Sequence, residues 1–219
     1  MAADVYSPRA GRPPSTSAGR LEQIAFDLFT QHGFDETTLE DVAAAAGISK
    51  RTFFRYHRSK NDLVWGDFDV HLAQFRAELT ARDGEPMMQA LRQAVVAFNR
   101  VEGEAVVQHR RRMQLILTVP ALQAHSTLRY AAWRQVVEEF AGRRSGHPRG
   151  TLLPRLVGHL ALATSVAAYE QWLAEPDAAL EPLIDSAFAA LATGFDAAAP
   201  AAGAAPSAPK GAVWHGLRP

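Results

Sequence analysis

The sequence contains no cysteine among its 219 residues. Disulfide scaffolds, thiolate zinc sites, CxxC redox motifs and cysteine nucleophiles are therefore excluded. The chain also lacks an excess of either charge, because 23 Lys and Arg residues balance 23 Asp and Glu residues. Without a net charge there is no global field that attracts nucleic acid, so any DNA binding must depend on local clusters of basic side chains.

Long apolar runs are scarce as well. The first twenty residues lack the apolar core of a secretory signal. The most apolar stretch, residues 156–168, is too short to span a bilayer and contains His159. With 47% hydrophobic and 21% charged residues, the composition is typical of a globular protein. We therefore expect a soluble, cytoplasmic protein with no membrane partner.

Catalytic signatures are also missing, since the sequence has no HExxH, P-loop, GxSxG or GxGxxG pattern. Asp67, Asp69 and His71 resemble a small metal cluster. Only Asp67 and His71 share a helical face, however, and two ligands are too few for a metal site. We expect no enzymatic activity, no cofactor and no metal.

What the sequence does contain is helix-forming residues almost throughout. Ala, Leu, Arg, Glu and Gln dominate, and apolar residues recur at spacings of three and four rather than alternating. No strand and no internal repeat is recognisable, so the expected fold is all-α. Besides a helix that begins at Thr37 or Thr38, helices are expected over residues 19–32, 50–57, 61–82, 87–101, 104–119, 127–144, 152–174 and 178–195.

Composition divides the chain into four parts. Residues 1–16 form a polar arm with Arg9 and Arg12, which is either disordered or a basic arm that contacts DNA. Residues 17–65 form a small helical domain, and residues 66–196 form a larger one. Residues 197–219 collapse to Ala, Pro, Gly and Ser, which indicates a disordered tail.

A helix-turn-helix pattern lies at about residues 38–57, where a turn at Gly47 joins two short helices. Thr37 with Glu40 fits a capping box at the start of the first helix, and Thr38 with Asp41 is a weaker version of the same device. The second short helix begins after Ser49, and its free backbone N–H groups can face an anion.

Basic side chains are concentrated on and just after this second helix, namely Lys50, Arg51, Arg55, Arg58 and Lys60. A recognition helix in the major groove of DNA needs such a positive edge. The alternative is a solvated basic helix on the surface. The threonine cap and the Ala-Gly-Ile-Ser turn make that alternative the weaker interpretation.

The segment TTLEDVAAAAGISKRTFFRYHRSKNDL resembles the DNA-binding domain of TetR-type transcriptional regulators over about residues 17–65. The Thr-Thr pair, the Ala-Gly-Ile-Ser turn, the aromatic pair and the Ser-Lys step all occur in register. The resemblance implies a homodimeric repressor that binds a palindromic operator through its first three helices. With the helix start at Ser49 included, the residues expected at the DNA are Thr38, Ser49, Lys50, Arg51, Thr52, Arg55, Tyr56 and Lys60.

Two positions depart from this family pattern. Many members carry Tyr where this chain has Phe54, which removes one hydroxyl that could reach a phosphate. Many carry Phe where this chain has His57, whose imidazole we expect at the edge of the domain, where it could respond to pH. Neither departure changes the resemblance to the family. The roles of the family's side chains cannot, however, be carried over to Phe54 and His57.

A closer similarity extends beyond this domain. The runs KRTFFRYHRSKNDLVWGDFD, HRRRMQLILTVPALQAHS and YAAWRQVVEEFAGR are similar to those of the mycofactocin-system regulators of actinobacteria, a subgroup of the TetR type. The similarity implies a small-molecule effector, specifically a long-chain acyl-CoA. It also implies that the C-terminal helices form both a ligand pocket and a four-helix dimer interface.

The apolar candidates for the effector pocket are Phe98, Met113, Leu117 and Trp133, although spacing does not separate pocket residues from core residues. Arg110, Arg111 and Arg112 begin an apolar helix. They are either a solvated face or, with Arg110 and Arg111 as the candidates, ligands of the coenzyme A phosphates. Consecutive helical positions diverge by about 100°, so only about one of the three should face inward.

The helix at residues 152–174 is apolar on nearly every face and must be covered all round. One interpretation is a central helix of a monomer, and the other is a helix that meets both the core and a partner subunit. On the dimer interpretation the interface includes Leu156, Leu160, Tyr169, Trp172, Leu183 and Phe188. A different function also stays open, namely a helical interaction module that uses the basic segment for a protein partner.

Overall fold

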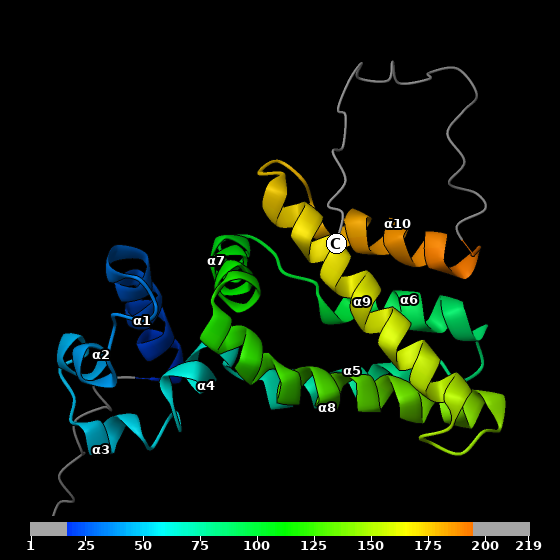
Figure 1. The fold of residues 1–219 in the computed structure, drawn as a ribbon, viewed down its shortest axis with the longest axis horizontal. Helices are drawn as coiled ribbons and strands as arrows, with labels where there is room; N and C mark the ends of the chain where they lie inside the picture. Colours follow the sequence, from blue (N-terminus) through cyan, green and yellow to red (C-terminus); the bar gives the residue numbers. More distant parts are fainter. Residues whose placement is uncertain (1–16, 195–219) are drawn as a thin grey trace, which may run out of the picture.

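The computed structural model describes residues 17–194, and the predictions for the N-terminal arm and the C-terminal tail lie outside this range. The described residues form ten helices and no strand, which confirms the all-α prediction (Figure 1). The helices are α1 (Ala18–His32), α2 (Leu39–Ala45), α3 (Lys50–Phe53), α4 (Lys60–Trp65), α5 (Phe68–Ala81), α6 (Met87–Phe98), α7 (Ala105–Thr118), α8 (Pro120–Ser145), α9 (Leu152–Ala174) and α10 (Leu180–Ala192).

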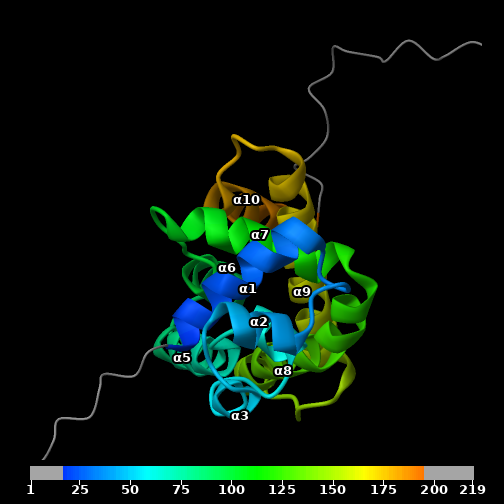
Figure 2. The same cartoon turned by 90° about the vertical axis from the view of Figure 1, so that its left-hand side faces the viewer.

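The first four helices gather at one end of the molecule, and the longer helices α5 to α10 form the rest (Figure 1). The end-on view shows α1, α2 and α3 nearest the viewer, with α7 behind α1 (Figure 2). Helix α4 packs against both α1 and α7, so it joins the small group of helices to the large one. A change in the position of one group of helices can therefore reach the other through α4 and its neighbours.

Two predicted helix bounds are wrong for identifiable reasons. The single helix expected at residues 61–82 is two helices, because Gly66 adopts φ 53° and ψ −137° between α4 and α5. That backbone conformation favours glycine, which has no Cβ to clash. The helix expected at residues 127–144 begins earlier, because Pro120 is already the first residue of α8. A proline is well placed there because the first helical N–H has no partner within the helix.

The larger group of helices has an aromatic centre and a close helix pair. Phe75 stacks on Trp133 with ring centroids 5.2 Å apart, and Phe98 lies 5.0 Å from Phe75. Helices α8 and α9 approach closely at Gly158, where a Cβ atom would lie 2.9 Å from Cγ of Glu138. This glycine therefore permits the contact between the two longest helices, and α9 begins and ends where the sequence predicts.

Candidate nucleic-acid interface and candidate effector cavity

The first short helix of the helix-turn-helix pattern begins with a complete capping box. Oγ1 of Thr38 accepts a 3.2 Å hydrogen bond from the Asp41 N–H, and the Thr38 N–H donates to the Asp41 carboxylate at 2.8 Å. The preferred prediction, a box formed by Thr37 and Glu40, is wrong. The Thr37 hydroxyl is buried and donates to the Gly33 carbonyl at 2.7 Å instead.

The turn between the two short helices depends on one glycine. Gly47 has φ 65°, and the Ile48 N–H donates to the Ala43 carbonyl at 2.9 Å. This left-handed residue ends α2 and redirects the chain. Ser49 then begins α3, because its Oγ accepts a 3.2 Å hydrogen bond from the Thr52 N–H. Thr38 and Ser49 therefore act as helix caps in this structure.

The second short helix presents an exposed basic edge. Lys50, Arg51 and Arg55 are exposed, whereas Thr52 and Tyr56 are half-buried. Lys50 forms an ion pair with Glu40 of α2, and the Arg55 guanidinium donates to the Tyr56 hydroxyl at 3.1 Å. Among residues 17–194, neither Arg51 nor Arg55 forms an ion pair with an acidic side chain. Within the described residues no carboxylate neutralises either guanidinium group, so both can meet an external anion.

Lys60 requires a correction, because it does not extend toward an external surface. Its Nζ donates to the carbonyls of Phe34 at 2.6 Å and Thr37 at 2.9 Å, and more weakly to that of Asp35 at 3.4 Å. The ammonium also lies 4.2 Å from the centre of the Phe34 ring. Burial lowers the pKa of Lys60. All three of its protons serve the loop between α1 and α2, so its role is structural.

The two departures from the family pattern lie in different environments. Phe54 is about half exposed and packs edge-on against Phe53. His57 is buried rather than placed at the domain edge, so that expectation is wrong. Its Nε2 has no hydrogen-bond partner among the described residues, and burial lowers the pKa of the imidazole. His57 therefore serves the core of the small domain as a neutral side chain.

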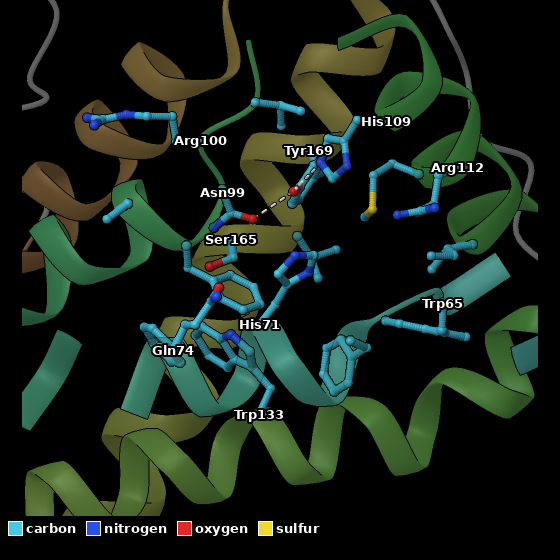
Figure 3. A pocket seen from close by; sticks show the side chains of 18 of the residues that line it. Trp65, His71, Gln74, Asn99, Arg100, His109, Arg112, Trp133, Ser165 and Tyr169 are labelled. Atoms are coloured by element: carbon cyan, nitrogen blue, oxygen red, sulfur yellow. Dashed lines mark hydrogen bonds between the residues drawn. The ribbon is translucent and has the colours of Figure 1, made fainter. Parts of the chain in front are cut away.

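A cavity of about 580 Å³ lies inside the larger group of helices, enclosed by residues from α4 to α9 (Figure 3). Its size is that of a small-molecule site. Three predicted effector residues, Phe98, Met113 and Trp133, line it. Leu117 does not line it and instead packs, half-buried, against the core.

A chain of hydrogen bonds crosses one wall of this cavity. The Asn99 amide N–H donates to the Val95 carbonyl at 2.7 Å, which leaves its Oδ1 to accept from the Tyr169 hydroxyl at 2.6 Å (Figure 3). Nε2 of His109 lies 2.8 Å from the same hydroxyl oxygen. The Tyr169 proton is already donated, so Nε2 carries the proton of a neutral imidazole. Burial, with the charges of Arg112 and His71, lowers the pKa of His109 to about 4.

The three consecutive arginines in the middle of α7 have three different environments. Arg110 lies over the Trp172 ring at 4.2 Å and donates to carbonyls at the end of α9, including that of Trp172. Arg111 forms an ion pair with Asp27 at 3.5 Å. Neither arginine lines the cavity, so their assignment to the effector is corrected. Arg112 does line the cavity, which agrees with the expectation that about one of the three arginines faces inward.

Sequence reasoning missed His109 and Arg112 as cavity residues, although a signal was present. His109, Arg112, Met113 and Ile116 recur at the spacing of one helical face, and all four line the cavity. Asn99 gave no signal, because it follows α6 in a connecting segment. Of the Asp67, Asp69 and His71 group, Asp69 pairs with Arg129 at 2.9 Å and His71 lines the cavity. Residues 17–194 contain no group of three or more His, Asp or Glu that could hold a metal.

The predicted dimer residues divide into two sets. Leu156 and Leu160 of α9 are 48% and 40% exposed, and Leu183 of α10 is half-buried against the core. Tyr169, Trp172 and Phe188 are buried within their own chain, so their assignment to the dimer interface is wrong. These aromatic side chains fill the core between α7, α9 and α10 and are not accessible to a second copy.

Helix α9 also bears on the membrane question. It is 23 residues long and, within residues 17–194, it is the one helix whose length and composition would allow it to cross a membrane. The apolar stretch at residues 156–168, which by itself is too short for a bilayer, lies within this longer helix. The core helix of a soluble protein passes the same test, and α9 packs against α8, α10 and α7.

Two protein-family models match the chain. Residues 23–64 match the model of bacterial regulatory proteins of the tetR family. Residues 85–196 match the MftR C-terminal domain, a TetR-type model. The matched segments correspond to the helix-turn-helix end of the molecule and to most of the helices that enclose the cavity.

Relatives and solved structures agree with these matches. The chain is 40% identical over 192 residues to a Mycobacterium tuberculosis protein named as the mycofactocin biosynthesis transcriptional regulator MftR, covering 87% of this chain and 97% of that protein. The fold resembles Thermus thermophilus FadR in complex with lauroyl-CoA, with a TM-score of 0.53, 22% identity and coverage of 89% and 100%. It also resembles Bacillus subtilis FadR in complex with stearoyl-CoA, with a TM-score of 0.56, 15% identity and coverage of 81% and 99%.

Proposed function

The chain belongs to the TetR family of bacterial transcriptional regulators, and from that premise we propose that it is a cytoplasmic repressor released from its operator by an apolar effector. The observation that carries this proposal is the exposed basic edge of α3, in the same chain as a ligand-sized cavity. A basic helix supplies affinity for DNA, and a cavity in the attached helices supplies a place for a controlling ligand.

In the proposed DNA complex, α3 enters the major groove. Arg51 and Arg55 contact base edges or phosphates, and the half-buried hydroxyls of Thr52 and Tyr56 lie beside the phosphate backbone. In this complex the start of α3, after Ser49, also faces the phosphate backbone with its first N–H groups.

The proposed regulator is a homodimer. Leu152, Leu153, Leu156 and Leu160 leave an exposed apolar face on α9, and a second copy of the chain would cover it. Two recognition helices about 34–36 Å apart then reach successive major grooves on one side of a palindromic operator. The dimer contact at α9 therefore determines the spacing of the helices that read the DNA.

The proposed effector is a long-chain acyl-CoA, with its acyl chain in the cavity. The lining is mainly apolar, with Phe75, Phe98 and Trp133 in contact with one another along it. The two FadR structures of the same fold are complexes with lauroyl-CoA and stearoyl-CoA. Arg100 is exposed and lines the cavity, so it replaces Arg110 and Arg111 as the cation proposed to meet a coenzyme A phosphate.

The test is a mobility shift with purified protein and the DNA upstream of its own gene, against a scrambled duplex, at several salt concentrations. A dimer that makes about six to eight phosphate contacts should show log K falling with log salt at a slope of roughly −5 to −7. Specific binding with this slope supports the regulator. Equal binding to both duplexes, or none, contradicts it and favours the protein-interaction alternative.

A further inference from the structure

One ion pair connects the cavity with the DNA-binding helices. Nη2 of Arg112, on α7, donates a 2.6 Å hydrogen bond to the carboxylate of Glu22, on α1. The two side chains are only 21% and 16% exposed, so the pair is largely shielded from solvent. Arg112 also lies 5.5 Å from the ring of Phe26, which belongs to the core around α1. Arg112 therefore faces the cavity and contacts α1 at the same time.

The chain bends directly over this pair. A Cβ atom on Gly66 would lie 3.1 Å from Oε1 of Glu22 and 3.3 Å from Nη2 of Arg112. Gly66 has φ 53° and is the break between α4 and α5, where the small group of helices joins the large one. The ion pair and the connection between the two groups thus occupy the same place, and a change in the pair acts directly on this connection.

Two donors at this end of the cavity lack acceptors. Nε of Arg112 and Nε1 of Trp65 are buried and have no hydrogen-bond partner among the described residues. Both residues line the cavity, and Trp65 is 8% exposed (Figure 3). A buried donor without an acceptor is costly, and a ligand oxygen would satisfy it. Because both groups can only donate, the ligand group that fits here is an oxygen acceptor.

We propose that the acyl oxygen of the effector binds at Trp65 and Arg112 and displaces the Glu22 carboxylate from Arg112. The apolar tail then lies along Phe75, Phe98 and Trp133. Loss of the ion pair frees α1 and the Gly66 connection and moves the recognition helices. The shared chemistry is an acyl oxygen on an apolar chain, either the carboxylate of a free acid or the carbonyl of a thioester.

The inference rests on the proposed function but has its own consequences. If Glu22 and the ligand compete for Arg112, each weakens the binding of the other by the same factor. Removing the charge of Glu22 should therefore strengthen ligand binding and, without ligand, weaken DNA binding. A merely structural ion pair would predict no gain in ligand affinity.

The chain offers a matched control on the same two helices. Arg111 of α7 pairs with Asp27 of α1 at 3.5 Å, but both side chains are about half exposed and neither lines the cavity. Glu22→Gln and Asp27→Asn each neutralise one carboxylate of α1 that pairs with α7. Any effect shared by both variants reflects general loosening between the helices, and an effect confined to Glu22→Gln reflects the cavity.

The experiment measures the affinity of the wild type, Glu22→Gln, Asp27→Asn and Arg112→Gln for laurate and lauroyl-CoA by tryptophan fluorescence, and their operator affinity by anisotropy. Compared with the wild type, we expect Glu22→Gln to bind whichever of the two probes the wild type binds about fivefold or more tightly. We expect it to bind the operator about fivefold or more weakly. Arg112→Gln should lose most probe binding, whereas Asp27→Asn should stay within about twofold of the wild type. Binding of laurate assigns the acceptor as a carboxylate, and binding of lauroyl-CoA alone assigns it as a thioester carbonyl.

Three results would overturn the inference: no binding of either probe to the wild type, unchanged probe affinity in Glu22→Gln, or undiminished probe affinity in Arg112→Gln. Failure of the proposed function has a different signature, because the wild type would then show no specific DNA binding. In that case the ratio of probe affinities between Glu22→Gln and Asp27→Asn still decides between competition at Arg112 and a structural ion pair.

Discussion

Nζ of Lys60, at the start of α4, lies 2.6 Å from the carbonyl oxygen of Phe34, which follows α1. The same ammonium also reaches the carbonyls of Asp35 and Thr37. One side chain thus satisfies three carbonyls of the loop that positions α2 against α1. The resemblance to the family places Lys60 at the DNA. In the structure Lys60 instead stabilises the loop between α1 and α2 within the DNA-binding domain.

Replacing Lys60 with Met should therefore destabilise the protein. The substitution keeps an unbranched chain of similar length but leaves the loop carbonyls without their charged donor. We expect the free energy of unfolding to fall by about 2 kcal/mol, since a hydrogen bond to a charged group contributes roughly 1.5–3 kcal/mol to stability. Chemical denaturation monitored by circular dichroism measures the change.

Lys50→Met is the matched control for this prediction. Lys50 forms only an exposed ion pair with Glu40, for which about 0–1 kcal/mol is expected. Equal stability losses in the two lysine variants would show that Lys60 has no special structural role.

Arg51→Ala and Arg55→Ala should weaken operator binding without changing stability. Both side chains are exposed, Arg51 on α3 and Arg55 in the turn that follows it, and neither forms an ion pair within the described part of the chain. A base-reading arginine should cost about 1–3 kcal/mol of binding and relax specificity at one base pair, whereas a phosphate contact should weaken all sequences alike.

The matched control for these arginines is Arg143→Ala, since Arg143 is exposed on α8 and pairs with Asp83 at 3.5 Å. Anisotropy titrations against the operator and single-base variants provide the measurement. Wild-type affinity in both α3 variants would remove α3 from the interface.

Stability should fall as the pH is lowered from about 6.5 toward 4, because of His109. Burial, with the nearby charges of Arg112 and His71, lowers the pKa of His109 from 6.5 to about 4. The unfolded chain therefore binds this proton more readily than the folded one, so its contribution is complete above pH 6.5 and is lost as the pH falls. At 1.36 kcal/mol per unit of pKa difference, the loss approaches roughly 3 kcal/mol.

His109→Gln isolates this contribution. Its amide can still donate to the Tyr169 hydroxyl, but it does not take up a proton. Burial also lowers the pKa of His57, which acts in the same direction and is unchanged in the variant. Between pH 7.5 and 4.5, measured also at pH 6 and 5, the unfolding free energy of the wild type should fall relative to that of the variant. Parallel curves for the two proteins would show that His109 is not the group that titrates.

Leu156→Lys and Leu160→Lys should convert a dimer into monomers at micromolar concentration. Both positions lie on the exposed face of α9, and a lysine at a covered interface would bury a charge without a partner. Val107→Lys is the control, since Val107 is 59% exposed but belongs to α7 and not to the leucine face of α9. Sedimentation equilibrium measures the mass. A monomeric wild type, or dimers in both α9 variants, would contradict the proposed interface.

Helical periodicity was sufficient to predict the fold class and most helices, because a 3.6-residue repeat and end signals are local properties. It failed where a residue has two local meanings. Pro120 can end one helix or begin the next, and Gly66 can be tolerated in a helix or break it. The structure resolves each case through the backbone: Gly66 adopts a positive φ, and Pro120 occupies the first helical position.

Site residues were harder to predict because their roles depend on neighbours distant in sequence. Lys60 looked like a phosphate ligand until its contact with Phe34, 26 residues away, was visible. Tyr169 and Trp172 are residue types that are common at protein interfaces, but here they are buried in the core of their own chain. Which of three arginines faces the cavity depends on how α7 is rotated against α1, and the sequence alone could say only that about one of them should.

The most direct test of the account is the operator affinity of the wild-type protein with and without saturating lauroyl-CoA, measured by anisotropy at one fixed salt concentration. We predict a specific dissociation constant of about 10⁻⁸ M or lower without ligand. With ligand it should rise about tenfold or more, within the usual range of coupling between two sites. An unchanged operator affinity, with lauroyl-CoA shown to be bound in the same sample, would contradict the proposal that the cavity controls DNA binding.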